Sequence, residues 1–125
     1  MKKELINVGA APIAPYSHGV RVENFVFTAG QLGLDPKTGK LVSGGIKAET
    51  RQVLENLTAV LKAAGSSLDR VLKTTVFIVD MAGDYAAMNE VYKEFFSKDP
   101  PARSTVEVRA LALSARVEIE AIAVI

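Results

Sequence analysis

Short apolar runs, separated by polar and turn-forming residues, fill the first 28 positions of the chain. Residues 3–8 predict a first strand. Residues 9–15 hold two prolines and several alanines and predict an irregular loop. The runs 19–22 and 25–28 flank Glu23 and Asn24, so we expect a hairpin with a tight turn.

The spacing of the apolar positions changes after a glycine-rich segment. Residues 33–45 carry the turn-forming residues of a long loop. Beyond them the apolar residues fall on one stripe at helical spacing, which predicts an amphipathic helix of about five turns that Gly65 ends as a C-cap. The stripe consists of Ile46, Thr50, Val53, Leu54, Leu57, Val60, Leu61 and Ala64. Residues 71–79 are rich in β-branched side chains and predict a strand.

A second helix and two more strands complete the chain. Asp84 is the candidate N-cap of this helix, and Pro100 and Pro101 end it. Its apolar stripe consists of Tyr85, Met88, Val91, Tyr92 and Phe95. The last strands are predicted over 103–108 and 116–124.

These elements predict an α+β fold, in which both helices cover one face of a mixed sheet. The last strand is apolar on both sides: one side carries Val117, Ile119, Ala121 and Ala123, and the other carries Ile122 and Val124 beside Glu118 and Glu120. Such a strand is covered on both sides, and two helices are too few for that. We therefore expect a neighbouring subunit to cover the second face, which makes the protein a homo-oligomer with an apolar interface.

Composition narrows the class of protein. The length of 125 residues predicts one domain over 1–125, and the apolar share of 49% is enough for a core. A net charge of +1 without a basic stripe argues against a nucleic-acid binder. The absence of cysteine excludes disulfides and thiol nucleophiles. No segment has the length and hydropathy of a signal peptide or a membrane span, so we expect a cytoplasmic protein.

Three familiar kinds of site are disfavoured. A metal site is not expected, because the chain has one histidine, no cysteine and scattered carboxylates. The run from Gly33 to Lys40 resembles a phosphate-binding loop, but it is one residue too long and Leu41 stands where Ser or Thr would follow; a simple turn is the better interpretation. Ser17 and His18 are adjacent in sequence, which is not the geometry of a catalytic triad.

Three other residues are candidates for chemistry. Arg103 opens a strand and is either a solvated strand-end arginine or a fork that holds a carboxylate through two parallel hydrogen bonds. Glu118 either pairs with Arg116 or Arg109, or is a partly buried acid that positions water and moves a proton. Tyr16 either packs in its loop or lines a cleft with its phenol.

Several blocks of sequence, in order along nearly the whole chain, resemble the RidA/YjgF family, also called the L-PSP endoribonuclease or translation-inhibitor family. The strongest are Pro101-Ala102-Arg103-Ser104-Thr105-Val106-Glu107-Val108 and the strand 117–124. The others are Ala14-Pro15-Tyr16-Ser17, Thr28-Ala29-Gly30-Gln31, residues 35–39, residues 73–77, and the helix segment from Asp84 to Phe96.

The resemblance implies a chorismate-mutase-like homotrimer with a central β-barrel, outer helices and three clefts between subunits. It implies that Arg103 and Glu118 are catalytic, with Arg103 holding a carboxylate, and that Tyr16, Ala29, Gly30, Asn89 and Thr105 bind substrate. Two departures are Ala29, where many members have serine, and Ala112, where a proline often follows leucine. The first removes a hydroxyl contact, and the second affects loop stiffness.

The activity implied is that of a 2-iminobutanoate/2-iminopropanoate deaminase. Such an enzyme hydrolyses the enamines and imines released by PLP enzymes, such as 2-aminoacrylate, to 2-keto acids and ammonium, with no metal or cofactor. Two other functions compete with it: a ligand-binding regulatory trimer that turns nothing over, and an endoribonuclease or translation inhibitor. Nucleic acid is not an expected partner, because RNA affinity requires phosphate neutralisation by basic residues. A membrane partner is not expected either.

Overall fold

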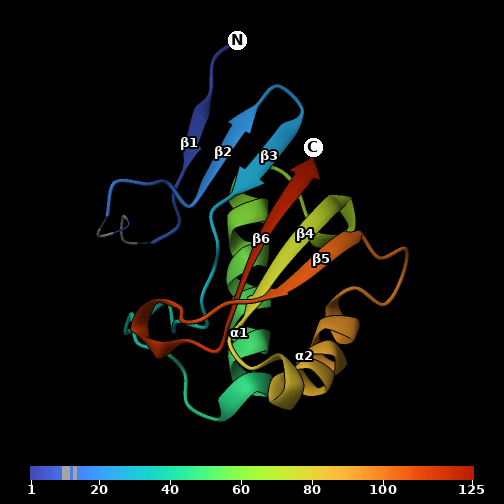
Figure 1. The fold of residues 1–125 in the computed structure, drawn as a ribbon. Coiled ribbons are helices and arrows are strands. Elements are labelled where there is room, and N and C mark those ends of the chain that lie inside the picture. Colours follow the sequence, from blue (N-terminus) through green and yellow to red (C-terminus); the bar gives the residue numbers. More distant parts are fainter. Residues whose placement is uncertain (10–11, 13) are drawn as a thin grey trace.

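In the part of the chain that the structure describes, six strands and two helices follow one another in the predicted order. The computed structural model describes residues 1–9, 12 and 14–125 (Figure 1). The strands are β1 (Glu4–Ile6), β2 (Gly19–Val22), β3 (Phe25–Thr28), β4 (Val71–Ile78), β5 (Ala102–Glu107) and β6 (Val117–Val124). The helices are α1 (Gly45–Ala63) and α2 (Met81–Phe95), and two 3₁₀ turns are η1 (Leu68–Arg70) and η2 (Ala112–Ser114).

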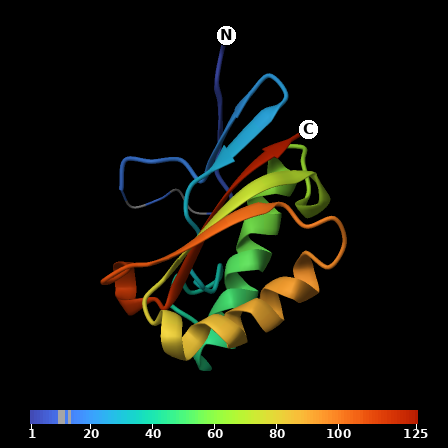
Figure 2. The same ribbon diagram turned by 45° about the vertical axis from the view of Figure 1, so that its right-hand side comes forward.

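The strands form one mixed sheet in the order β1-β2-β3-β6-β4-β5. All neighbours are antiparallel except β4 and β5, which run parallel because α2 carries the chain back across the sheet between them. Figure 2 shows α1 and α2 on the same side of this sheet. The expected α+β class, with a mixed sheet and both helices on one face, is confirmed.

The core lies between this sheet face and the stripe of α1. Val53, Leu54, Leu57 and Leu61 of α1 are fully buried, as the helical spacing predicted. In β6 the predicted alternation holds, because Val117, Ile119, Ala121 and Ala123 are buried while Glu120 and Ile122 are exposed. The faces of β6 therefore carry different chemistry, and this decides where the candidate site residues point.

The helix ends follow one prediction and contradict another. Gly65 follows α1 in a left-handed conformation (φ +87°), and its amide donates to the Lys62 carbonyl, which is the predicted glycine cap. Asp84 is not the N-cap of α2. Asp80 is, because its carboxylate accepts a hydrogen bond from the Gly83 amide (3.0 Å).

Asp84 lies instead within the first turn of α2 and is buried, with Arg116 donating to it at 3.3 Å. The same arginine donates its backbone amide to buried Glu49 of α1 (2.8 Å). The acid that the sequence suggested as a cap thus belongs to a polar contact that joins both helices to the start of β6. The first strand is also shorter than predicted, Glu4–Ile6 rather than 3–8.

The second face of the sheet carries exposed apolar side chains. They include Phe25, Phe27, Val106 and Ile122, each at least 36% exposed. Among the described residues no helix covers this face (Figure 2). None of the described helices is both long enough and apolar enough to cross a membrane.

Candidate functional site

Arg103 lies on β5, the edge strand next to β4, and points to the helix side of the sheet. Its Cα pairs with that of Thr74, so the two side chains share a face. Thr74 is fully buried on that face, where its hydroxyl forms a hydrogen bond of 2.7 Å with the Tyr92 hydroxyl of α2. Arg103 is thereby placed against α2.

Three side chains of α2 hold the guanidinium of Arg103. Nη1 donates to Oδ1 of Asn89 (2.8 Å), and Nη2 donates to the hydroxyl of Tyr85 (3.0 Å). The ζ carbon lies 4.8 Å from the ring centroid of Tyr92, within cation–π distance. Tyr85 and Asn89 are one helical turn apart, and Tyr92 lies three residues further, so one stripe of α2 provides all three contacts.

Within the described part of the chain, the charge of Arg103 has no acidic partner. All the groups that hold it are neutral, and among the described residues no carboxylate forms an ion pair with it. By contrast, Arg51 pairs with Glu94, and Arg116 pairs with Glu49 and Asp84. Arg103 is therefore a preorganised cation whose remaining N–H donors can serve an anion.

Thr105 follows two positions later on the same face of β5, in register with Val76. Its hydroxyl oxygen is buried and has no hydrogen-bond partner among the described residues. A buried hydroxyl without a partner costs free energy. Thr105 therefore offers a donor or acceptor beside Arg103 that the rest of the described chain does not use.

Glu118 lies on β6 and points to the opposite side of the sheet. Its Cα pairs with Phe77, whereas its neighbours Val117 and Ile119 face the helices and are fully buried. Neither of the ion pairs considered for it is present in the described part of the chain, because Arg116 pairs with Glu49 and Asp84, and Arg109 makes no ion pair. Partial burial, and then the negative charge of Glu120, raise the pKa of Glu118.

Gly30 lies directly against the carboxylate of Glu118. A Cβ at position 30 would lie 2.6 Å from the carboxyl carbon of Glu118 and would overlap this group. The glycine therefore allows the carboxylate to lie where it does. The adjacent bridge between Gln31 and Ile119, formed by two backbone hydrogen bonds of 2.8 and 3.2 Å, fixes this loop to β6.

Replacing Gly30 by alanine is expected to displace the Glu118 carboxylate and leave the fold intact, because the end of a glutamate side chain moves easily. We expect kcat/KM of the activity proposed below to fall between about tenfold and a hundredfold, as for a misplacement of about 1 Å, with little change in melting temperature. Steady-state kinetics and thermal unfolding measure both. In a Glu118→Gln background the same substitution should have little further effect; independent, multiplicative losses would contradict this explanation.

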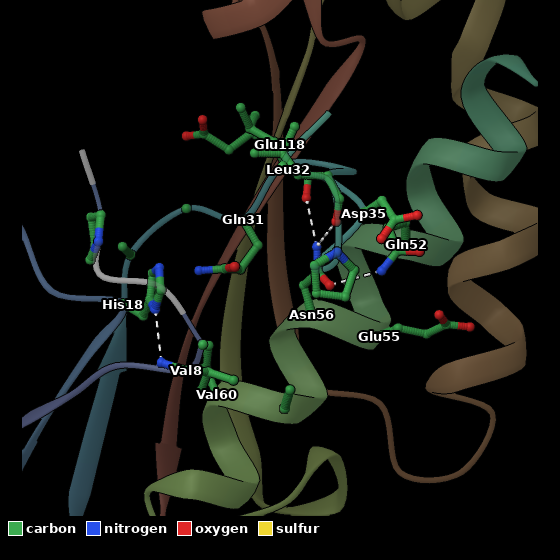
Figure 3. Close-up of a pocket in the computed structure, with 18 of the residues that line it drawn as sticks. Val8, His18, Gln31, Leu32, Asp35, Gln52, Glu55, Asn56, Val60 and Glu118 are labelled. Carbon is green, nitrogen blue, oxygen red and sulfur yellow. Dashed lines mark hydrogen bonds between the residues drawn. The ribbon is translucent and has the colours of Figure 1, made fainter. Parts of the chain in front are cut away.

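A cavity of about 820 Å³ opens beside Glu118 and Gly30. Figure 3 shows Glu118 on one side of it and Gln52, Glu55 and Asn56 of α1 on the other. Tyr16 and Ala29 also line it, and Tyr16 is 53% exposed. The cavity thus collects four of the predicted site residues: Tyr16, Ala29, Gly30 and Glu118.

Two other sequence features have structural roles. His18 lines the cavity, but its Nδ1 accepts a hydrogen bond from the Val8 amide (3.0 Å) and so joins the residue before β2 to the segment that follows β1. The run 33–40 is a turn, as interpreted from the sequence: the Asp35 amide donates to the Lys40 carbonyl, the Gly39 amide donates to the Asp35 carbonyl, and Gly39 has φ +71°. Neither feature supports a triad or a phosphate loop.

The predicted residues form two groups within one chain. Arg103, Asn89 and Thr105 lie on the helix side, near α2. Tyr16, Ala29, Gly30 and Glu118 lie around the cavity, with the Glu118 side chain on the other side of the sheet. Because the sheet separates Arg103 from Glu118, a single chain does not bring them to one small ligand.

Sequence reasoning missed Tyr85 and Tyr92 as partners of Arg103, since both were interpreted only as part of an apolar helix stripe. The available signal was their spacing with Asn89 at 85, 89 and 92, which places three polar-tipped side chains on one helix face. It also missed the residues of α1 that line the cavity, because Gln52 and Asn56 look like ordinary solvated helix positions.

Comparison with known proteins agrees with the fold. The family model described as Endoribonuclease L-PSP matches residues 8–125. A RutC family protein of Pyrococcus horikoshii is 55% identical over 90% of this chain and 88% of its own length. The mouse protein named 2-iminobutanoate/2-iminopropanoate deaminase is 47% identical over 98% of this chain and 91% of its own. The chain belongs to the RidA/YjgF family.

A solved RidA/YjgF relative extends the agreement to three dimensions. The crystal structure of E. coli TdcF with bound serine superposes with a TM-score of 0.91 at 42% identity, covering 98% of each chain. The two departures from the RidA/YjgF pattern are also placed. Ala29 lines the cavity, and its amide donates to the His18 carbonyl (2.8 Å). Ala112 begins η2, where Leu113 and Ser114 both have φ of 59°.

Proposed function

We propose that this RidA/YjgF protein is a 2-imino acid deaminase, which hydrolyses 2-iminobutanoate, 2-iminopropanoate and their enamine tautomers to 2-keto acids and ammonium. The observation that carries the proposal is the uncompensated charge of Arg103, held by neutral side chains with donors to spare. A 2-imino acid supplies the missing carboxylate. The name of the mouse relative, and the serine bound to the E. coli relative, support a ligand of this class.

The reaction needs few groups. Arg103 binds the carboxylate through parallel hydrogen bonds and fixes the orientation of the adjacent carbon. Glu118, when ionised, accepts a proton from water as the water oxygen adds to the carbon of the C=N bond, and it passes this proton to the nitrogen. Glu118 then takes the proton of the new hydroxyl group and transfers it to the nitrogen as the C–N bond of the tetrahedral intermediate breaks, so that ammonia leaves and the keto acid forms. Acid–base catalysis of this kind contributes about 10²–10⁴-fold.

The separation of Arg103 and Glu118 supports a site shared between copies of the chain. We propose a homotrimer of chorismate-mutase type, with the uncovered sheet faces forming a central barrel. The exposed side chains of Phe25, Phe27 and Ile122 supply an apolar surface for that contact. In such an assembly the Arg103 of one subunit and the Glu118 of the next belong to one cleft. Tyr16, Gly30, Ala29, Asn89 and Thr105 are the proposed substrate-binding residues.

The raised pKa of Glu118 predicts the acid limb of the pH profile. The base must be ionised, so kcat/KM is expected to fall as the pH drops through this pKa, which lies above the ordinary value for glutamate because of burial and the charge of Glu120. Glu120→Gln removes the repulsion and should move the limb to lower pH. The measurement is kcat/KM against pH for both proteins. If the acid limb lies at the ordinary glutamate pKa and does not move in Glu120→Gln, Glu118 is not the base.

A competition assay tests the proposed activity. A PLP-dependent dehydratase generates 2-aminoacrylate or 2-aminocrotonate, semicarbazide traps the imine, and keto-acid formation is followed with and without the protein. Diversion of the imine from the trap, at catalytic protein concentration, supports the deaminase. If the protein binds a keto acid but diverts no imine, it is a ligand-binding trimer instead. RNA cleavage without imine hydrolysis would favour the endoribonuclease or translation inhibitor.

A further inference from the structure

The hydroxyl of Tyr85 is in an unusual position for a partly exposed tyrosine. The residue lies in α2 and is 38% exposed, yet its hydroxyl accepts a hydrogen bond from the guanidinium of Arg103. The ring also lies beside that guanidinium, at 5.8 Å from the centroid to the ζ carbon. Tyr85 therefore borders the same surface on which Arg103 presents its free donors.

The direction of the hydrogen bond leaves the phenol proton available. A guanidinium only donates, so the Tyr85 oxygen is the acceptor in its contact with Nη2 (3.0 Å). Among the described residues the Tyr85 O–H itself has no acceptor. The polar side chain of Asn89, and then the positive charge of Arg103, hold the pKa of Tyr85 below its usual value. A more acidic phenol is a stronger donor to an anion.

The donors of Arg103 that remain free adjoin this hydroxyl. Nη1 uses one N–H on Asn89, and Nη2 uses one on Tyr85. Each nitrogen keeps a second N–H, so an anion can still be bound. An anion at Nη2 lies next to the atom that Nη2 already contacts, the Tyr85 oxygen.

We propose that Tyr85 is a further binding residue, whose hydroxyl donates a hydrogen bond to the substrate carboxylate that Arg103 holds. The inference rests on the proposed function and deepens it, because it assigns a third donor to the same carboxylate. Tyr85 thereby makes the site selective for an ionised carboxylate over an ester or amide, which offers the phenol a weaker acceptor.

The test is ligand binding to the assembled protein, which does not depend on turnover. Binding of 2-oxobutanoate and of its methyl ester is measured by calorimetry for wild type, Tyr85→Phe and a control, Thr58→Val. The control also loses one hydroxyl from a helix, but that hydroxyl is bonded to the Leu54 carbonyl of α1 (2.7 Å). A crystal structure of the 2-oxobutanoate complex locates the carboxylate.

We expect Tyr85→Phe to weaken binding of the keto acid about tenfold, as for a hydrogen bond to a charged group. Binding of the ester should change by less than about twofold, and Thr58→Val should bind both ligands as wild type does. In the complex a carboxylate oxygen should lie within hydrogen-bond distance of the Tyr85 oxygen. Unchanged keto-acid affinity in Tyr85→Phe, or a carboxylate held by Arg103 away from Tyr85, overturns the inference and leaves the deaminase standing. If wild type binds no keto acid, both are overturned.

Discussion

Arg103→Gln is expected to lower kcat/KM for imine hydrolysis by about a thousandfold. Truncating one partner of a desolvated charge pair costs about 2–5 kcal/mol, and here the other partner is the substrate carboxylate. Glutamine keeps much of the length and polarity but loses the charge and the fork. Arg103→Lys should recover only part of the loss, because a lysine is a point charge that cannot donate two parallel bonds. Steady-state kinetics with enzymatically generated imine measure both variants.

A matched substitution separates the role of Arg103 from the general loss of an arginine. Arg51 is also near an aromatic ring, 6.0 Å from the Phe95 centroid, but it pairs with Glu94 on the surface. Arg51→Gln should therefore leave kcat/KM within about twofold, since exposed pairs contribute at most about 1 kcal/mol. Full activity in Arg103→Gln would exclude Arg103 as the carboxylate site.

Glu118→Gln is expected to lower kcat by about 10²–10⁴-fold, the range that one positioned acid–base group contributes. Keto-acid binding should change little, because the carboxylate of the ligand is held on Arg103 and not on Glu118. Glutamine is nearly isosteric, so the contact with Gly30 is retained. The measurement combines single-turnover kinetics with calorimetric binding of 2-oxobutanoate.

The control for Glu118 lies two residues further on the same face of β6. Glu120→Gln removes the carboxylate of an exposed residue whose Cα pairs in register with that of Thr75. At a pH well above the acid limb it should retain activity within about twofold. If Glu118→Gln binds the keto acid and hydrolyses imine as fast as wild type, water activation requires another residue.

The spacing of apolar residues predicted the helices and strands of this fold well, because that spacing reflects which side chains are buried. The stripe of α1 and the alternation of β6 follow directly from which side chains leave water. The N-cap of α2 was mispredicted because two aspartates precede the apolar stripe and either could act as the cap. Local sequence does not reveal that Asp84 accepts a hydrogen bond from Arg116, which is more than 30 residues away. Such a contact depends on tertiary packing alone.

The candidate site was less accessible to sequence reasoning. Arg103 was singled out as a possible carboxylate fork, but its partners could not be derived, since β5 and α2 meet only after the parallel crossover is formed. The reason for Gly30 was equally hidden, because it depends on the carboxylate of a residue 88 positions away in sequence coming within contact distance. The family resemblance named both residues without giving these physical reasons.

The placement of Arg103 and Glu118 on opposite faces of one sheet has a consequence for how the proposed activity scales with protein concentration. In the proposed trimer, a subunit that keeps its fold after dissociation carries half of two different sites and completes neither. Specific activity should then fall on dilution below the dissociation constant of the assembly, even though every chain remains native. The catalytic unit of the proposed assembly is the contact between chains rather than the chain itself.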